Sequence, residues 1–347
     1  MKQKKILLVM PDFQCIYKVV IQELMRQDYD VTYVSLPFLR QAIHRSNPII
    51  NYAEGILNRF IDIGKYNEIK ETVDNNFFDV IFAIGGFFFS QRILTRAKKR
   101  NPLLKTIVFY WDSFSIWDYS KTIEYFDRRF SFDIEDCKKY FSKKLQYHPN
   151  FYLTSKKPNP FPQYDICNIS TTAMSLHMSR LCVVYALKED ADKMGLTSFI
   201  RLYMPEDKKR TLLQWITHIK YLLKPRHRDF FCKRNYGIKK GIVTSHKLTL
   251  EECYIIESNS RCIIDVPVDG QHGHTIRSLN AIASGQKLIT TDAYLRNEPF
   301  FHPNNICVID AKYPHINEEF LSSAMVDVDI SHLKLDNWLI YILDGKE

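Results

Sequence analysis

The sequence predicts an α/β protein made of two consecutive doubly wound domains. Continuous apolar runs alternate with segments of helical apolar spacing along most of the 347 residues. A segment with three prolines, at residues 156–162, interrupts this alternation, which then resumes. The length also suits two domains of ordinary size. We therefore expect one domain over residues 1–155, a second over 156–325 and a helical tail over 326–347.

The elements expected in the first domain follow from two patterns. A short run of uninterrupted apolar residues is typical of a parallel strand that is buried on both faces. Apolar residues three or four positions apart indicate a helix that covers such a sheet. The predicted strands are Lys5–Met10, Val31–Ser35, Asp79–Ile84, Thr106–Tyr110 and Phe130–Phe132, and the predicted helices are Tyr17–Met25, Ser90–Lys99 and Ile134–Phe141.

The same two patterns return in the second domain. Thr249 and Glu252 have the spacing of a capping box, which places a helix start at this point and a helix end near Ser258. The predicted strands are Tyr164–Ile169, Phe199–Tyr203, Arg261–Asp265, Lys287–Thr291 and Asn305–Asp310. The other predicted helices are Leu176–Met194, Lys209–Leu223, Thr275–Ser284 and Ile330–Leu343.

Composition narrows the class of protein. Hydrophobic residues make up 46% and charged residues 25%, so the chain can bury full cores and is not a disordered tail. The net charge of +9 suits an anionic partner, which charge alone leaves open among nucleotide phosphate, anionic lipid and nucleic acid. No two of the eight cysteines have C-x-x-C spacing, which favours scattered thiols in a reducing compartment.

Targeting signals are not evident. The apolar run Ile6–Met10 ends at Pro11 and is too short for the core of a signal peptide. No stretch approaches the roughly 20 apolar residues that a membrane span needs. We therefore expect a cytoplasmic protein.

The segment Cys262–Asp292 is the strongest candidate for a ligand site. It predicts a strand, a polar loop, a short helix and a second strand, and ligands of doubly wound sheets bind beyond the carboxyl ends of strands. Gly270 and Gly273 would allow the backbone to approach a ligand closely. The N–H groups at a helix start near Thr275 would attract a phosphate, which Arg277 could clamp. The alternative is an ordinary strand–loop–helix corner.

Two histidines in this loop have two interpretations. His272 and His274 could donate hydrogen bonds to a phosphate or a sugar, or they could be exposed polar residues of an ordinary corner. They are two positions apart, and no further histidine or cysteine stands nearby at the spacing of zinc ligands. We therefore expect no metal site here.

Two aspartates follow predicted strands of the first domain. Asp12 stands after the first strand and Asp112 stands after the strand that ends at Tyr110. Either carboxylate could accept the proton of an attacking hydroxyl if partial burial held its pKa near neutral. The alternative is that Asp12 belongs to a turn or caps a helix, and that Asp112 caps the end of its strand.

Residues 271–292 carry a resemblance to a known family. Their pattern, Q-x-G-x-T-x-R-S-x-N-A-x-A-S-G-x-K-L-I-T-T-D, resembles the donor-domain segment of GT-B glycosyltransferases. More narrowly, it is similar to bacterial lipopolysaccharide, capsule and exopolysaccharide biosynthesis proteins. Residues 111–113 and 126–136 also resemble the N-terminal domain of that family. Asn280 and His274 depart from the pattern, because the family usually has glutamate and leucine there.

The resemblance implies two Rossmann-like domains that face a cleft, with an acceptor domain first and a nucleotide-sugar donor domain second. It implies transfer of a sugar to a surface-glycan acceptor, and Asp12 and Asp112, which are candidates because each follows a strand, would be the bases. No cofactor is implied, since the nucleotide-sugar is a substrate, and a helix dipole with Arg277 and Lys287 would replace a metal at the leaving diphosphate. The implied donor-binding residues are Gly270, Gln271, His272, Gly273, His274, Thr275, Arg277, Asn280 and Lys287.

A basic stretch with interleaved aromatic residues spans residues 208–240. Such runs are often solvated surfaces. The functional interpretation is contact with an anionic membrane, where a lipid-linked glycan acceptor resides, which would place the protein at the inner face of the cell membrane. Nucleic acid is disfavoured as a partner, because no recognition motif accompanies the charge.

Two other functions are alternatives to glycosyl transfer. A Rossmann oxidoreductase is disfavoured, because the first strand is followed by the sequence MPDFQC rather than by G-x-G-x-x-G. A non-catalytic binding or scaffold subunit of the same fold stays open, because Asn280 lacks the charge of the usual glutamate. Nucleotide binding without turnover would favour the scaffold.

Overall fold

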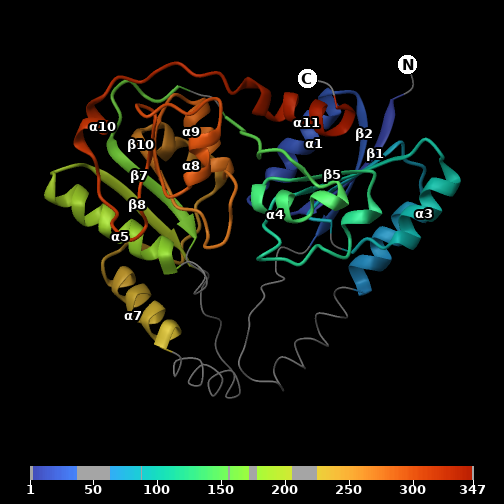
Figure 1. The fold of residues 1–347 in the computed structure, drawn as a ribbon, viewed down its shortest axis with the longest axis horizontal. Helices are drawn as coiled ribbons and strands as arrows, with labels where there is room; N and C mark the ends of the chain where they lie inside the picture. The colour runs from blue at the N-terminus through green and yellow to red at the C-terminus, as the bar shows by residue number, and fades with distance from the viewer. Residues whose placement is uncertain are drawn as a thin grey trace.

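The computed structural model describes residues 3–36, 63–86, 88–154, 157–171, 178–204 and 225–345. Figure 1 shows two lobes, each built around a β-sheet with helices on its faces. Both sheets have six strands, and every strand pair in them is parallel. The predicted α/β class with two doubly wound domains is confirmed.

The first sheet has the strand order β2-β1-β3-β4-β5-β6. The first strand therefore lies inside the sheet, and the strand order reverses between β1 and β3. In doubly wound folds, ligands bind beyond the carboxyl ends of the strands at such a reversal. Its strands are β1 (Lys4–Pro11), β2 (Tyr29–Leu36), β3 (Val80–Ile84), β4 (Lys105–Tyr110), β5 (Arg128–Ser131) and β6 (Gln146–Tyr147). Its helices are α1 (Ile16–Arg26), one over residues 63–75, α3 (Gln91–Arg100) and α4 (Ile134–Lys139), with short 3-10 turns η1 (Ile123–Tyr125) and η2 (Phe141–Lys143).

The second sheet has the strand order β12-β11-β10-β7-β8-β9. Its reversal lies between β7 and β10, so the crevice expected for a ligand lies beyond the carboxyl ends of these two strands. Its strands are β7 (Tyr164–Thr171), β8 (Ser198–Tyr203), β9 (Val243–Thr244), β10 (Ser260–Asp265), β11 (Lys287–Thr290) and β12 (Ile306–Val308). Its helices are α5 (Met178–Lys193), α7 (Pro225–Lys239), α8 (Leu250–Ser258), α9 (Ile276–Ala283) and α10 (Glu318–Ser322), with the 3-10 turn η4 (Ala293–Asn297).

Burial explains why the strands read as continuous apolar runs. In β1, Leu7 and Val9 pack into one hydrophobic cluster, whereas Ile6, Leu8 and Met10 pack into another on the opposite face of the sheet. Alternate side chains of a strand point to opposite faces, so a sheet covered on both sides needs apolar residues at every position. The same pattern separates Ile264 and Ile263 of β10.

The predicted strands all appear within three residues of their expected bounds, and α8 begins after the capping box of Thr249 and Glu252. No sequence pattern predicted β6, β9, α10 or the helix over residues 63–75. The segment that forms α7 was predicted only as a basic stretch. The predicted helix Lys209–Leu223 lies outside the described residues, as do residues 155 and 156 at the expected domain boundary.

The C-terminal tail returns to the first domain. It forms a 3-10 turn, η5 (Ser331–Leu333), and then α11 (Leu335–Asp344), rather than the single helix expected over 330–343. Figure 1 shows α11 beside α1 on the N-terminal lobe. Trp338 is completely buried there, its ring 4.7 Å from that of Phe109 and 4.8 Å from that of Phe151, and its Nε1 donates to the Pro149 carbonyl. The tail thus connects the second domain to the core of the first domain.

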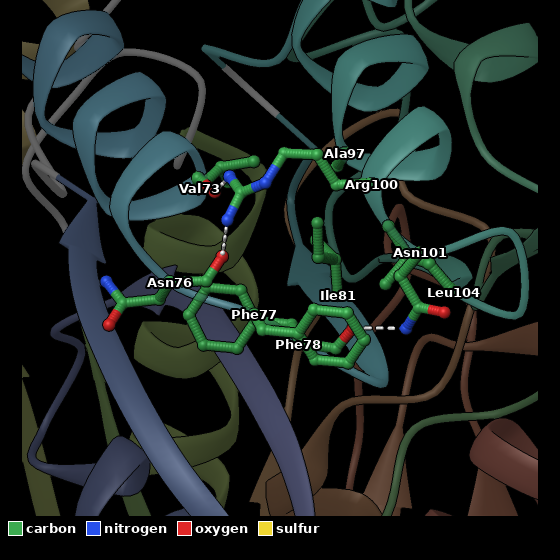
Figure 2. A pocket seen from close by; sticks show the side chains of 9 residues that line it. All are labelled: Val73, Asn76, Phe77, Phe78, Ile81, Ala97, Arg100, Asn101 and Leu104. Carbon is green, nitrogen blue, oxygen red and sulfur yellow. Dashed lines mark hydrogen bonds between the residues drawn. The ribbon is translucent and has the colours of Figure 1, made fainter.

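A small cavity lies at the amino end of the first sheet, far from the strand ends where a ligand is expected. Figure 2 shows Arg100 reaching the Asn76 carbonyl and Asn101 reaching the Phe78 carbonyl beside it. Its volume is about 10 Å³, which is room for no more than a single water molecule. Arg100 also donates to the Val73 carbonyl, so these side chains cap the helix over residues 63–75 and form no ligand site.

Among the described residues, no helix is both long enough and apolar enough to cross a bilayer.

Candidate functional site

The start of α9 is anchored to the end of β10 by a buried carboxylate. Asp265, the last residue of β10, accepts hydrogen bonds from the hydroxyls of Thr275 and Ser278 and from Arg277 Nη1 at 2.5 Å. Burial would raise the pKa of Asp265, but Arg277 and the two hydroxyls outweigh that effect and lower it. Thr275 is the N-cap, because its side chain accepts from the Ser278 N–H at 3.1 Å. This helix start therefore has a fixed position at the sheet edge.

Arg180 is a second cation at this edge that the sequence analysis missed. It lies in the first turn of α5, where its Nε donates to the Val266 carbonyl at 2.6 Å and its Nη1 to the Thr171 carbonyl at 3.0 Å. Burial and repulsion from Arg277 lower the pKa of Arg180 to about 10, so it stays charged at neutral pH. The sequence signal that could have identified Arg180 is an arginine in the first turn of a helix that follows the polar end of a strand. Two guanidinium groups thus lie at the carboxyl ends of β7 and β10.

The loop before α9 is docked on the first domain. The Ser115 hydroxyl donates to the Gly270 carbonyl at 2.9 Å, and the His272 N–H donates to the Asp133 carboxylate at 2.9 Å. The Ile134 N–H completes the contact by donating to the His272 carbonyl at 3.3 Å. Asp133 is fully buried and also caps α4. Residues 270–273 therefore seat the second domain across the ends of β4 and β5, and we call them the docking loop.

The packing of the two domains requires a glycine at position 273. A Cβ atom at this position would lie 2.2 Å from the Phe132 carbonyl oxygen and 2.6 Å from the Phe132 ring. Gly270 has a φ of +86°, which favours glycine for a separate reason. The structure therefore shows a close approach of Gly273 to the first domain, and its close approach to a ligand stays a prediction.

Replacing Gly273 with alanine is expected to lower the free energy of unfolding by about 1–3 kcal/mol, because the new methyl group overlaps backbone that cannot move aside easily. Urea unfolding of the variant measures this. Gly64→Ala is the matched control, because nothing lies within 4 Å of its added Cβ and alanine favours the helix there. An equal stability of both variants would contradict the docking of this loop.

Asp112 meets the docking loop at the junction of the two domains. The Gln271 side-chain amide lies 3.4 Å from the Asp112 carboxylate. Burial raises the pKa of Asp112 to about 6, and a hydrogen bond from Trp111 opposes this only in part. A carboxylate with such a pKa is ionised at neutral pH and is basic enough to accept a proton from a hydroxyl.

Asp12 lies close by but in a different environment. Asp12 is exposed, and the ring of its neighbour Phe13 lies 6.4 Å from the ring of Trp111, although β3 separates β1 from β4 in the sheet. The two residues that follow, Gln14 and Cys15, both have positive φ, of 49° and 59°. Such strain in consecutive non-glycine residues is typical of functional loops.

His274 is neither an exposed residue nor a ligand donor. Its side chain is 0% exposed, with Nδ1 at 2.7 Å from Asp292 and Nε2 at 2.8 Å from Glu298. Glu298 also accepts from the Tyr147 hydroxyl of the first domain at 2.8 Å. Burial lowers the pKa of His274, but the two carboxylates overcome this and raise it to about 9. A buried imidazolium thus joins the domains, and both expectations for His274 are corrected.

The side chains of Asn280 and Lys287 also hydrogen-bond to other parts of the protein. The Asn280 side-chain oxygen accepts from the Leu153 N–H at 2.8 Å, which fixes the segment between the domains. Lys287 opens β11 at the opposite, amino edge of the sheet, where its Nζ donates to the Asn304 carbonyl at 2.7 Å and to Ser323. The structure places Lys287 outside the candidate site and gives Asn280 a structural partner.

The predicted residues therefore separate into two groups. The docking loop and Asp112 meet at the domain junction, with Thr275 and Arg277 at the adjoining sheet edge, whereas His274, Asn280 and Lys287 are tied to protein partners. Within the described ranges, no group of three or more histidine, cysteine, aspartate or glutamate side chains is arranged to hold a metal ion.

Comparisons with known proteins give the fold but no family. No family model matches the chain, and no curated protein matches it in sequence. The UDP-forming α,α-trehalose-phosphate synthase from Burkholderia xenovorans is similar in structure, with a TM-score of 0.53, 8% identity and coverage of 100% of this chain and 92% of that chain. The corresponding synthase from Burkholderia vietnamiensis has a TM-score of 0.51 and 9% identity, covering 99% and 92%.

The N-terminal domain of trehalose-6-phosphate phosphatase from Candida albicans is a third similar structure, with a TM-score of 0.50, 9% identity and coverage of 96% of this chain and 94% of that chain. These likenesses extend over nearly the whole chain. Together with the two parallel sheets, they show that the protein has the GT-B architecture.

Proposed function

We propose that the protein is a glycosyltransferase that moves a sugar from a nucleotide-sugar donor to a hydroxyl of a glycan acceptor. One observation carries this proposal. The docking loop joins a guanidinium-bearing edge of the second domain, with Arg180 and Arg277, to an aspartate of raised pKa in the first domain, Asp112. Anion binding and proton acceptance are two chemical tasks of glycosyl transfer, and the groups that we propose for them come from the two different domains.

The donor is proposed to bind at the second domain. Arg180 and Arg277 would receive the diphosphate at the carboxyl ends of β7 and β10, with the start of α9 adding its dipole. These groups can stabilise the departing diphosphate, so we expect no metal requirement. Two of the similar structures, with TM-scores of 0.53 and 0.51, are UDP-forming synthases, which makes UDP the first nucleotide to test.

The acceptor is proposed to enter from the first domain, where Asp112 would take the proton of the attacking hydroxyl. The resemblance of residues 271–292 to surface-polysaccharide enzymes suggests a lipopolysaccharide, capsule or exopolysaccharide acceptor. Part of the basic stretch is described: in α7 the side chain of Tyr236 is 46% exposed, and Ile238 is 45% exposed beside Lys239 and Lys240. We propose that this end of α7 contacts an anionic membrane surface.

A second candidate function is a non-catalytic nucleotide-binding or scaffold subunit of the same pathway. Asn280 favours it, since its side-chain oxygen holds the Leu153 N–H and is not offered to a donor sugar. The two functions differ in turnover rather than in nucleotide binding.

The proposal is tested by a thermal-shift screen with UDP, GDP, CMP and ADP. A nucleotide at about 100 times its Kd should stabilise the protein by roughly 2.7 kcal/mol, which is a readily measured rise in Tm. Arg277→Ala should lose this shift, because its guanidinium would hold the diphosphate, whereas the exposed Arg228→Ala on α7 should keep it. If none of the four nucleotides raises the Tm of the unaltered protein, the nucleotide-sugar proposal is wrong.

A further inference from the structure

The cation proposed to meet the donor is already shared by two carboxylates of the protein. Arg277 Nη1 lies 2.5 Å from Asp265, and Arg277 Nε lies 3.9 Å from the Glu257 carboxylate at the end of α8. The Arg277 side chain is still 25% exposed, so a ligand can reach it. Glu257 is 14% exposed and has no other cation among its recorded partners in the described residues. Arg277 thus contacts the buried Asp265 closely and Glu257 at a longer distance, and part of its side chain is exposed to solvent.

The groups that face Glu257 come from every element around it. Arg277 of α9 attracts its charge, and Asp265 of β10 repels it. Cys253 and Tyr254 of α8 and Cys167 of β7 are also near, and burial keeps all three groups neutral by raising their pKa values. For Glu257 itself, burial is the largest influence and raises the pKa to about 7, although Arg277 opposes it. Its charge therefore depends on Arg277 more than on any other group.

We propose that Glu257 is a positioning residue that competes with the donor diphosphate for Arg277, so that binding of the diphosphate is coupled to uptake of one proton by Glu257. This rests on the proposed function, because it assumes that the diphosphate meets Arg277. When the anion draws the guanidinium toward itself, Glu257 loses the one cation that lies near it among the described residues, and it does so in a buried place. The Glu257 carboxylate then takes a proton from solvent, and no bond of the ligand is made or broken.

The direction of the pH dependence follows from this exchange. Below neutral pH, Glu257 is already protonated and Arg277 is available to the anion. Above neutral pH, Glu257 must be protonated on binding, so the affinity falls as pH rises, by at most about tenfold for each pH unit. The phosphate of the ligand loses its own proton near neutral pH, which acts in the opposite direction, so the Glu257→Gln variant is needed as a reference.

The test is calorimetric titration of the whole protein with UDP between pH 6 and pH 8.5. The Kd of the unaltered protein should equal that of Glu257→Gln at pH 6 and exceed it by about tenfold at pH 8.5. Glu251→Gln is the matched control, because this exposed glutamate lies on the same helix, and it should follow the unaltered protein at every pH. Repeating the titration in two buffers of different ionisation heat should show proton uptake by the unaltered protein that Glu257→Gln lacks.

Each outcome decides the matter. Equal Kd values for the unaltered protein and Glu257→Gln at pH 8.5, or UDP binding without proton uptake near pH 7.5, overturn the role of Glu257 while leaving the nucleotide proposal standing. If Glu257→Gln fails to fold, proton uptake by the unaltered protein at pH 8.5 decides, because the phosphate of the ligand, with a second pKa of about 6, is fully ionised there and takes up no proton itself. If UDP does not bind at any pH, the proposed function fails, and inorganic pyrophosphate becomes the probe: binding with the same pH dependence supports the coupling, and absence of binding overturns it.

Discussion

Replacing His274 with alanine is expected to lower the free energy of unfolding by about 3–5 kcal/mol near pH 6.5, because it leaves the buried Asp292 carboxylate and the partly buried Glu298 carboxylate without their shared cation. The pKa of His274 supports this magnitude. Its rise from 6.5 to about 9 corresponds to about 3 kcal/mol. Urea unfolding measures the loss. His315→Ala is the control, since this histidine is exposed, and it should change stability by less than about 0.5 kcal/mol.

The cost of His274→Ala should also depend on pH. The folded protein holds the imidazole proton more tightly than the unfolded chain does, so the stabilisation is complete below the unfolded pKa, near 6.5. It is lost as pH rises through the folded pKa of about 9. The difference in stability between the two proteins should therefore shrink between pH 6.5 and pH 9.5. A cost that is below 1 kcal/mol, or that is equal at both ends of this range, contradicts the buried imidazolium.

Replacing Asp112 with asparagine is expected to lower the rate of sugar transfer by about 10²–10⁴-fold while leaving the Kd for UDP unchanged. Asparagine keeps the size of the side chain and its contact with Gln271 but accepts no proton. The rate of the unaltered protein should fall as pH drops through about 6, where Asp112 becomes protonated. Release of UDP from a UDP-sugar in the presence of acceptor measures transfer.

Two controls separate the candidate bases. Asp118→Asn removes an exposed carboxylate from the loop that follows β4 and should leave the rate unchanged. Asp12→Asn tests the second predicted aspartate, which is exposed at the end of β1. If Asp112→Asn transfers sugar at the rate of the unaltered protein, Asp112 is not the base. Transfer that stops only in Asp12→Asn would move the role to that residue.

The sheets were predictable because burial on both faces forces an unbroken apolar signal. Runs such as Lys5–Met10 and Asp79–Ile84 therefore gave strands close to their observed bounds. β6 and β9 have two residues each, too few for any pattern to appear. The helix α7 was missed for a different reason, since its basic residues hide the few buried positions, such as Phe230.

The candidate site was predictable only in part, because the sequence shows which residues are polar but not which partners they meet. Thr275 and Arg277 stand where a helix start follows a buried strand, and the predicted helix start is confirmed. His274 and Gly273 stand in the same polar loop and had the same sequence signal as their neighbours. Their partners, Glu298 and Phe132, come from distant positions in the chain. Arg180 was overlooked because its neighbour Val266 is 86 positions away. Long-range contacts decided each of these cases.

The most direct test of the central claim is hydrogen–deuterium exchange with and without saturating UDP. The claim is that a nucleotide diphosphate binds at the carboxyl ends of β7 and β10, between Arg180 and Arg277. UDP should then slow amide exchange in the first turn of α5 and in residues 265–280, and exchange at the amino-end cavity beside Arg100 should stay unchanged. UDP that protects neither of the first two segments, or that protects only residues elsewhere, contradicts the claim.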